Sequence, residues 1–259
     1  MSCLRPDCDE CTHNHESYCQ NFMAPTYNAK WPDGSKTMGG YSKKWRGHSH
    51  FVVKIPDAIS SESAAPMLCG GITAFSPLMQ YGVKKGSRVG IVGIGGLGHY
   101  GVMGAKALGA ERIIAISRSS GKKADAMKMG ATDFIATDED KDWAKKFANS
   151  VDIIVSTVSS PKMPLEQYLQ LIKVKGHFIQ VGAPEDNIPG FNAFSLIAKG
   201  VKIGGSSIGS PDDIRHMLDL FAKTGTNTWN NNYPMKEANK AIVDMDQGKA
   251  RYRIVLVNE

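Results

Sequence analysis

One stretch of sequence decides the fold: Ser87-Arg88-Val89-Gly90-Ile91-Val92-Gly93-Ile94-Gly95-Gly96-Leu97-Gly98. Its first half is an apolar run over 88–92 that predicts a buried strand, and its second half opens a helix predicted over 97–108. The glycines follow the spacing G-x-G-x-x-G. Gly93 permits a tight turn, Gly95 lets the main chain approach a pyrophosphate, and Gly98 lets the helix pack close to the strand. This context predicts a dinucleotide-binding loop.

Strands and helices alternate on the carboxyl side of this loop. Predicted strands cover 112–116, 134–136, 151–156, 177–181 and 201–204, and predicted helices cover 122–129, 143–149, 165–172 and 194–198. Such alternation is typical of βαβ units and predicts an α/β fold with a Rossmann doubly wound parallel sheet. Outside this series we expect a strand over 51–55, helices over 60–80, 212–222 and 235–247, and a closing strand over 253–257.

The turn after the second strand indicates which dinucleotide is bound. A NAD-binding unit carries Asp or Glu there, which holds the ribose 2′-hydroxyl. Here Ser117 occupies that position and is followed by Arg118, Ser119 and Lys122. A 2′-phosphate needs hydrogen-bond donors and positive charge, and a carboxylate repels it, so the turn predicts NADP(H) rather than NAD. The alternative is that these basic residues are ordinary solvated surface.

A glycine-rich turn also occurs in other nucleotide-binding and methyl-donor folds. A methyltransferase needs an acid at the end of the second strand, where this chain has Ser117. A short-chain dehydrogenase needs Tyr-x-x-x-Lys downstream of the glycine motif, whereas the only such pair, Tyr81 and Lys85, lies upstream of it. We therefore retain the dinucleotide interpretation.

The composition limits which other classes of protein this chain could belong to. The 259 residues are 42% hydrophobic and 22% charged, which is typical of a globular chain and argues against disorder. The formal net charge of +6 is dispersed, so it gives only weak support for a nucleic-acid partner. No apolar stretch is long enough for a membrane helix, and the N-terminus lacks a secretory h-region. We expect a cytoplasmic protein with no nucleic-acid or membrane partner.

Four of the five cysteines lie close together near the N-terminus. Cys3, Cys8, Cys11 and Cys19 follow the spacing C-x4-C-x2-C-x7-C, and four thiolates can close a tetrahedral, structural zinc site. A redox pair at Cys8 and Cys11 is one alternative, but this loop does not follow a strand and open a helix. A nucleic-acid-binding zinc knuckle is another, and the acidic residues of the loop argue against it.

These segments together resemble one family, the zinc-dependent medium-chain alcohol dehydrogenases, and within it the NADP-dependent cinnamyl-alcohol-dehydrogenase-like branch. The resemblance is carried by the cysteine loop, the glycine motif, the turn at Ser117, and the segments Gly39-Gly40-Tyr41, Phe51-Val52-Val53-Lys54-Ile55-Pro56, Ala65-Pro66-Met67-Leu68-Cys69-Gly70-Gly71-Ile72-Thr73 and Ala250-Arg251-Tyr252-Arg253. It implies a nucleotide-binding domain inside a split, GroES-like catalytic domain. The expected boundaries are 1–64, 65–207 and 208–259.

The resemblance also implies an activity: NADP(H)-dependent interconversion of primary alcohols and aldehydes, assisted by a catalytic zinc. It implies a homodimer through the edge strand near 201–208. It assigns Cys69 to the catalytic zinc; without it, Cys69 would be interpreted as a buried apolar cysteine. The cofactor-binding residues that it implies are Thr73, Gly93, Gly95, Gly96, Leu97, Gly98, Ser117, Arg118, Ser119, Lys122, Thr157, Val181, Gly182, Ala183, Ser206, Ile208 and Arg253.

The sequence departs from the family pattern in two places. The first gap of the cysteine loop is C-x4-C where the family has C-x2-C, which makes zinc binding by Cys3 less secure. The family also carries a further segment ahead of this loop that supplies other catalytic-zinc ligands, and this chain offers only Cys69. We therefore expect a truncated chain with an incomplete catalytic zinc site. The alternative is a catalytically inactive NADP-binding or regulatory protein.

Overall fold

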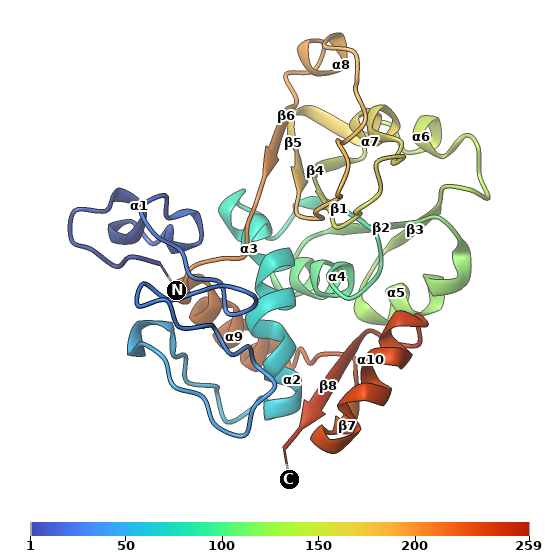
Figure 1. The fold of residues 1–259 in the computed structure, drawn as a ribbon. Coiled ribbons are helices and arrows are strands. Elements are labelled where there is room, and N and C mark those ends of the chain that lie inside the picture. Colours follow the sequence, from blue (N-terminus) through green and yellow to red (C-terminus); the bar gives the residue numbers. More distant parts are fainter. Residues whose placement is uncertain (1, 259) are drawn as a thin grey trace. The chain divides into compact units, whose positions relative to one another are not determined.

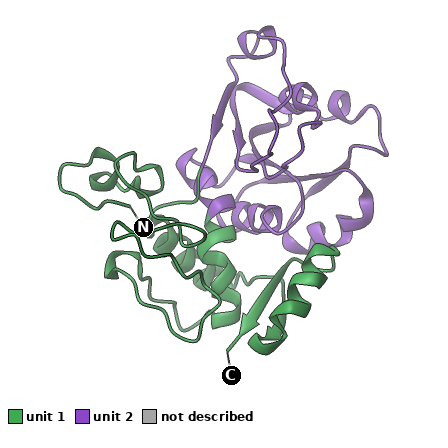
Figure 2. Cartoon of the chain, in the orientation of Figure 1, with its two compact units in different colours: residues 1–72, 207–259 green, residues 73–206 purple. Residues whose placement is uncertain are grey.

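The computed structural model describes residues 2–258, and the chain forms two compact units (Figure 2). Unit 1 combines the two chain ends, 1–72 and 207–259, and unit 2 is the continuous segment 73–206. These divisions lie near the boundaries expected at 65 and 207. The first boundary lies after residue 72 rather than at 65. No loop marks it, because α2 (Ser61–Pro66), η3 (Met67–Gly71) and α3 (Ile72–Gln80) follow one another directly.

Unit 2 is built on a six-stranded parallel sheet (Figure 1). Its strands are β1 (Arg88–Val92), β2 (Arg112–Ser117), β3 (Asp133–Ala136), β4 (Val151–Ser156), β5 (Ile172–Gln180) and β6 (Lys202–Gly205), in the order β3-β2-β1-β4-β5-β6. The central strands are apolar on both faces because helices cover a parallel sheet on both sides. The chain order reverses between β1 and β4, which is where ligands bind in such folds. The predicted doubly wound sheet is confirmed.

Helices connect the strands of unit 2. They are α4 (Gly98–Ala107), η4 (Ser120–Lys122), α5 (Lys123–Met129), α6 (Trp143–Lys146), α7 (Leu165–Leu171) and α8 (Phe194–Ile197). Helix α4 contacts β1 and β2, α5 contacts β3, and α7 contacts β5. The main core joins fully buried strand residues such as Ile114, Ile154 and Phe178 to Leu169 of α7. This packing fixes the carboxyl ends of the strands, where the candidate site lies.

Unit 1 is mostly loop in its first fifty residues, with short helices α1 (Asp9–Thr12), η1 (Glu16–Tyr18) and η2 (Ser49–Phe51). The C-terminal part adds α9 (Pro211–Thr224), β7 (Asn230–Pro234), η5 (Met235–Glu237), α10 (Ala238–Asp246) and β8 (Arg253–Val257). Helix α9 begins with a capping box, in which Ser210 and Asp213 each accept a hydrogen bond from the main-chain N–H of the other. Strands β7 and β8 form a two-stranded parallel sheet.

The structure corrects two sequence predictions in unit 1. The segment 51–55 is not a strand, because no strand of residues 2–258 pairs with it; η2 ends at Phe51 and an irregular segment follows. Strand β7 was not predicted, since Asn230-Asn231-Asn232-Tyr233-Pro234 carries no apolar alternation and is ordered by pairing with β8. In unit 2, β5 begins at Ile172 rather than at 177.

Membrane-spanning helices were not expected from the sequence. Within residues 2–258 the structure has no helix with both the length and the apolar character needed to cross a bilayer.

Candidate functional site

The glycine loop between β1 and α4 has the geometry that its spacing predicts. Gly93 has a φ of 86°, in the left-handed region that favours glycine. A Cβ on Gly98 would clash with the carbonyl oxygen of Gly93, so only glycine allows α4 to begin this close to the strand. A Cβ on Gly95 would meet no atom within 4 Å, so this position faces open space. The loop therefore leaves room for a ligand beside its main chain.

Thr157, just after β4, holds the loop in place. Its hydroxyl lies within hydrogen-bond distance of two carbonyl oxygens, 2.9 Å from that of Val92 and 2.8 Å from that of Gly93. Within residues 2–258, the main-chain N–H groups of Gly96 and Leu97 make no hydrogen bond to a main-chain acceptor. Amide groups left free at the start of a helix are suited to bind phosphate oxygens. The fixed loop and its free donors form a candidate pyrophosphate cradle.

The turn after β2 lies next to this cradle. Arg118 and Ser119 are exposed, and Ser117 is the half-buried last residue of the strand. Lys122 extends from the turn to the loop and donates from Nζ to the carbonyl oxygen of Ile94 at 2.7 Å. This bond places the turn and the glycine loop at one edge of the sheet. It also shows Lys122 bracing the loop, a contact that the sequence does not reveal.

Polar side chains end β4 and β5 at the same edge, and another directly follows β6. In parallel register Ser156 lies opposite Gln180, and Gln180 lies opposite the last residue of β6, which precedes Ser206. Among the described residues, Ser156 Oγ, Gln180 Oε1 and Ser206 Oγ are buried without a hydrogen-bond partner. Buried polar atoms are almost always paired in proteins. Such a row of unpaired atoms is expected where a polar ligand binds.

The residues that follow β5 are also held at this edge. The main-chain N–H groups of Val181 and Gly182 both donate to the carbonyl oxygen of Ser156, at 2.9 and 3.1 Å. Gln180 Nε2 donates to the carbonyl oxygens of Val158 and Gly182, at 2.8 and 2.7 Å. Ala183 comes next and is exposed. The structure thus brings the predicted residues at the ends of β1, β2, β4, β5 and β6 to one edge.

In unit 1 the four N-terminal cysteines form one cluster. Their Sγ atoms all lie within 4.8 Å of one another, with Cys3 and Cys11 at 3.7 Å and Cys8 and Cys19 at 3.8 Å. Main-chain hydrogen bonds, chiefly from Cys3 and then from Phe22, lower the pKa of Cys19 to about 6. At Cys3 and Cys8 the main-chain hydrogen bonds are outweighed by burial and neighbouring side chains, which raise the pKa of Cys3, and that of Cys8 to about 12, so Cys19 ionises before either of them. A lowered pKa favours the thiolate, which is the form that binds metals. The cluster is the only such group of three or more possible metal ligands among the described residues.

Cys69 lies apart from this cluster, in the π-helical turn η3 between α2 and α3. Cys69 is exposed, so its interpretation as a buried apolar cysteine is wrong. Single π-turns inserted in α-helices are frequent at functional sites. Two further predicted residues of unit 1 are Ile208, which is exposed, and Arg253, the first residue of β8. Thr73 belongs to unit 2 and lies at the start of α3.

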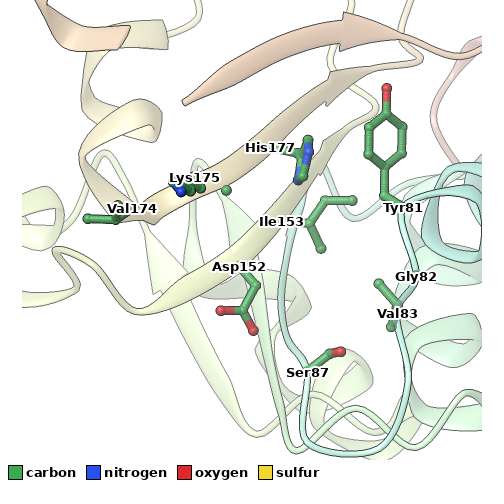
Figure 3. A pocket seen from close by; sticks show the side chains of 10 residues that line it. Tyr81, Gly82, Val83, Ser87, Asp152, Ile153, Val174, Lys175 and His177 are labelled. Atoms are coloured by element: carbon green, nitrogen blue, oxygen red, sulfur yellow. The ribbon is translucent and has the colours of Figure 1, made fainter. Parts of the chain in front are cut away.

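An open cavity of about 240 Å³ lies at the opposite, amino-terminal edge of the sheet (Figure 3). Ser87, Asp152 and His177 are among its lining residues. Asp152 already accepts a hydrogen bond from the main-chain N–H of Arg88 at 2.8 Å and lies 3.4 Å from Lys173 Nζ. Burial, and secondarily Lys202, lowers the pKa of His177. The predicted cofactor residues lie at the carboxyl edge, so this cavity is not the cofactor site.

Comparison with known proteins identifies the family. Residues 96–223 match the family model described as zinc-binding dehydrogenase. NADP-dependent alcohol dehydrogenase 6 of Saccharomyces cerevisiae is 40% identical over 261 residues, which cover 99% of this chain and 71% of the yeast protein. The chain belongs to the zinc-binding dehydrogenase family.

Three further proteins are similar to this chain. Cinnamyl alcohol dehydrogenase 2 of Rauvolfia serpentina is 38% identical, over 96% of this chain and 68% of its own length. Among solved structures, a cinnamyl alcohol dehydrogenase of Sorghum bicolor matches with a TM-score of 0.88 and 33% identity, over 99% of this chain and 72% of that one. CAD from Helicobacter pylori, complexed with NADP(H), matches with a TM-score of 0.86 and 32% identity, with the same coverage of both chains.

The described residues fit a structural zinc and a bound dinucleotide, two groups that membership of this family implies. A tetrahedral zinc with Zn–S bonds of about 2.3 Å places its sulfurs about 3.8 Å apart, which is close to the two Sγ distances of the cysteine cluster. The C-x4-C gap therefore does not prevent Cys3 from joining the cluster. For the dinucleotide, the open space at Gly95 and the unpaired atoms at the ends of β4 to β6 are the observations that fit.

Sequence reasoning missed three polar residues at the carboxyl edge. Ser156 and Gln180 could have been found, because each is a polar residue that ends an apolar strand run. Glu139, after β3, accepts hydrogen bonds from Ser120, the residue that follows the 117–119 turn. No local pattern indicates that contact, since it depends on how β2 and β3 pair.

Proposed function

We propose that this chain is an NADP(H)-binding dehydrogenase that takes part in the interconversion of primary alcohols and aldehydes. The observation that carries the proposal is the placement of the glycine loop beside the Ser117–Arg118–Ser119 turn, joined by the bond from Lys122 to Ile94. This turn offers hydroxyl and guanidinium donors where a NAD-specific chain offers a carboxylate. The relatives named for NADP-dependent and cinnamyl alcohol dehydrogenases support the same assignment.

Each part of the site has a task in this proposal. Gly93 to Gly98 hold the pyrophosphate on main-chain amides, and Arg118 with Ser119 holds the 2′-phosphate. The ends of β4 to β6 present main-chain and side-chain polar groups to the rest of the dinucleotide. When bound, NADP(H) supplies or accepts the hydride.

We assign Cys69 to the catalytic zinc of the family. A catalytic zinc has three protein ligands and one open position. Within residues 2–258 the cysteine cluster is the only group of three or more possible ligands, and Cys69 is not part of it. Cofactor binding is therefore the property that the described residues support most completely, and zinc-assisted turnover is tested separately.

Two measurements test the proposal. In a fluorescence titration we expect this chain to bind NADPH more tightly than NADH; equal affinities would contradict NADP specificity. In the second, the chain loaded with zinc is mixed with NADPH and cinnamaldehyde or an aliphatic aldehyde. Loss of NADPH absorbance that depends on zinc supports the dehydrogenase, and binding without turnover supports the inactive alternative.

Arg118→Ala tests the 2′-phosphate assignment directly. A charge-assisted hydrogen bond is worth roughly 1.5–3 kcal/mol, so NADPH affinity is expected to fall on the order of tenfold. NADH affinity is expected to stay within about twofold, because NADH has no 2′-phosphate for Arg118 to bind. Lys128→Ala, which removes an exposed charge from α5, serves as the control. Equal losses for both cofactors would show that Arg118 does not bind the 2′-phosphate.

We also propose a homodimer, formed through β6, and a cytoplasmic location. Strand β6 is an edge of the six-stranded sheet, and an unpaired edge can pair with a second copy. Sedimentation at several concentrations tests this assembly: a mass of one chain throughout would exclude it. Ile203→Pro, within β6, should lower the dimer fraction if the edge is the interface.

A further inference from the structure

The loops that follow β2 and β3 leave the sheet side by side. Ser117 and Ala136 are paired in register, and two more main-chain bonds continue the ladder beyond them. Thr137 N donates to the Ser117 carbonyl oxygen, and Asp138 N donates to that of Arg118, both at 2.9 Å. The acidic segment 138–140 therefore lies against the turn that we assign to the 2′-phosphate.

One carboxylate of this segment takes up donors of the turn. Glu139 Oε1 accepts a hydrogen bond from the main-chain N–H of Ser120 at 2.8 Å and lies 3.1 Å from its hydroxyl. An oxygen of a bound phosphate accepts the same kinds of hydrogen bond, from a backbone N–H and from a hydroxyl. Ser120 directly follows Ser119 in the chain, so the carboxylate stands where an incoming anion would need donors.

The charge of Glu139 is not neutralised by a neighbour. Among the described residues no ion pair involves Glu139, whereas the next acid, Asp140, pairs with Lys146 at 2.8 Å. Hydrogen bonding by Lys146 lowers the pKa of Asp140. Asp138 also has no ion pair among the described residues, but its carboxylate accepts from the Thr137 hydroxyl. Glu139 is therefore the carboxylate of this segment that accepts hydrogen bonds from Ser120 and has no cationic partner.

We propose that Glu139 is a specificity-determining residue that limits the preference of this site for NADPH over NADH. Its carboxylate competes with the 2′-phosphate for the Ser120 donors and repels it, since both carry negative charge. NADH has no phosphate there and does not encounter this competition. The inference rests on the proposed assignment of the turn to NADP(H).

Glu139→Gln is the sharpest test. The glutamine amide oxygen can still accept from Ser120, so the variant removes the charge and keeps the hydrogen bond. Because Glu139 is exposed and its charge is screened by solvent, we expect NADPH to bind on the order of fivefold more tightly. NADH affinity should change less than twofold, and the gain for NADPH should shrink as salt is raised.

Glu111→Gln provides the matched control. It removes the same charge just before β2, at the opposite edge of the sheet, where Glu111 lies 3.9 Å from Arg88. We expect no change in the NADPH-to-NADH ratio. Thermal unfolding of each variant verifies that it is folded before its affinities are compared.

The outcomes separate this inference from the proposed function. If the wild-type chain prefers NADPH and Glu139→Gln leaves the ratio unchanged or lowers it, the inference is overturned and the proposed function stands. If the wild-type chain binds NADPH and NADH equally and Glu139→Gln binds NADPH more tightly, the inference is supported. The proposed NADP specificity of the wild-type chain is then contradicted. An equal gain for both cofactors also overturns the inference.

Discussion

At residue 98 the absence of one methyl group decides how a helix meets a strand. A Cβ there would clash with the Gly93 carbonyl oxygen, the same oxygen that Thr157 Oγ1 approaches to 2.8 Å. The clash is with main chain, so no side-chain rotation relieves it. Any larger residue must move the glycine loop away from β1 or pull α4 out of contact with the strand. The loop that would hold the pyrophosphate is therefore sensitive to this one position.

Gly98→Ala is expected to weaken both the site and the fold. Overpacking of this kind costs typically 1–3 kcal/mol of stability. A misplaced loop should lower NADPH affinity by about tenfold or more, because the amides no longer converge on the pyrophosphate. Gly190→Ala is the control, since a Cβ at Gly190 meets nothing within 4 Å. Unchanged affinity in a stable Gly98→Ala variant would show that the loop does not bind the cofactor.

At the scale of elements, β2 and β3 are joined by an ion pair at their amino ends. Arg112 Nε and one terminal nitrogen donate to the two carboxylate oxygens of Asp133, both at 2.9 Å. The hydrogen bonds from Arg112 lower the pKa of Asp133, and Thr132 adds to the effect. Two parallel bonds fix the register of the strands as well as adding energy. That register places Glu139 beside Ser120 at the other end.

This pair should give the stability a defined pH dependence. The pKa of Asp133 is lower when folded than when unfolded, so its contribution is complete above the unfolded pKa of about 3.9 and is lost as pH falls through the folded value. In urea titrations, Asp133→Asn should lower the free energy of unfolding at pH 7 by about 1 kcal/mol. As pH falls below about 3.9, the variant should lose less stability than the wild type, because it has no Asp133 carboxylate to protonate.

The control for this prediction is Asp186→Asn, which changes an exposed loop carboxylate. It should follow the wild-type dependence. If Asp133→Asn and the wild type lose stability in parallel on acidification, the ion pair does not contribute to the pH dependence.

The features that the sequence predicts come from local patterns, and the features that it misses depend on pairing between distant segments. Strand β1 and the turn at Ser117 were predictable, because a buried parallel strand is a continuous apolar run and the glycine spacing is local. Strand β7 was not, because its polar residues become a strand only by pairing with β8. The contact of Glu139 with Ser120 was hidden for the same reason, since nineteen positions separate the two residues.

At the scale of the whole molecule, zinc and cofactor are assigned to different units. The cysteine cluster belongs to unit 1, and the glycine loop and the 117–119 turn belong to unit 2. Within unit 1 the cysteine loop is tied to later residues: Asn21 Nδ2 donates to Cys8 Sγ at 3.1 Å, and the buried Glu16 lies 2.6 Å from His50 Nε2. A structural zinc should therefore order the first fifty residues rather than the cofactor loop.

Removing the zinc tests this separation. We expect about one zinc per chain, held by the four cysteines. Cys19→Ser should abolish that zinc and raise amide hydrogen exchange over residues 2–51, because the loop loses the ligand whose thiolate its main chain stabilises. NADPH affinity should stay within about twofold, since the glycine loop is held by Thr157 and Lys122 of its own unit.

Cys69→Ser is the matched control, because it removes a thiol from unit 1 outside the cluster. A catalytic zinc needs three protein ligands, and Cys69 belongs to no group of three among the described residues. Cys69→Ser should therefore leave both the zinc content and the exchange of residues 2–51 as in the wild type. Loss of the one zinc in Cys69→Ser but not in Cys19→Ser would place the metal at Cys69 and refute the four-cysteine site. Parallel loss of zinc and of NADPH affinity in Cys19→Ser would show that the cysteine loop also supports the cofactor site. The two cysteine variants thus decide between a metal that orders only its own loop and one on which cofactor binding depends.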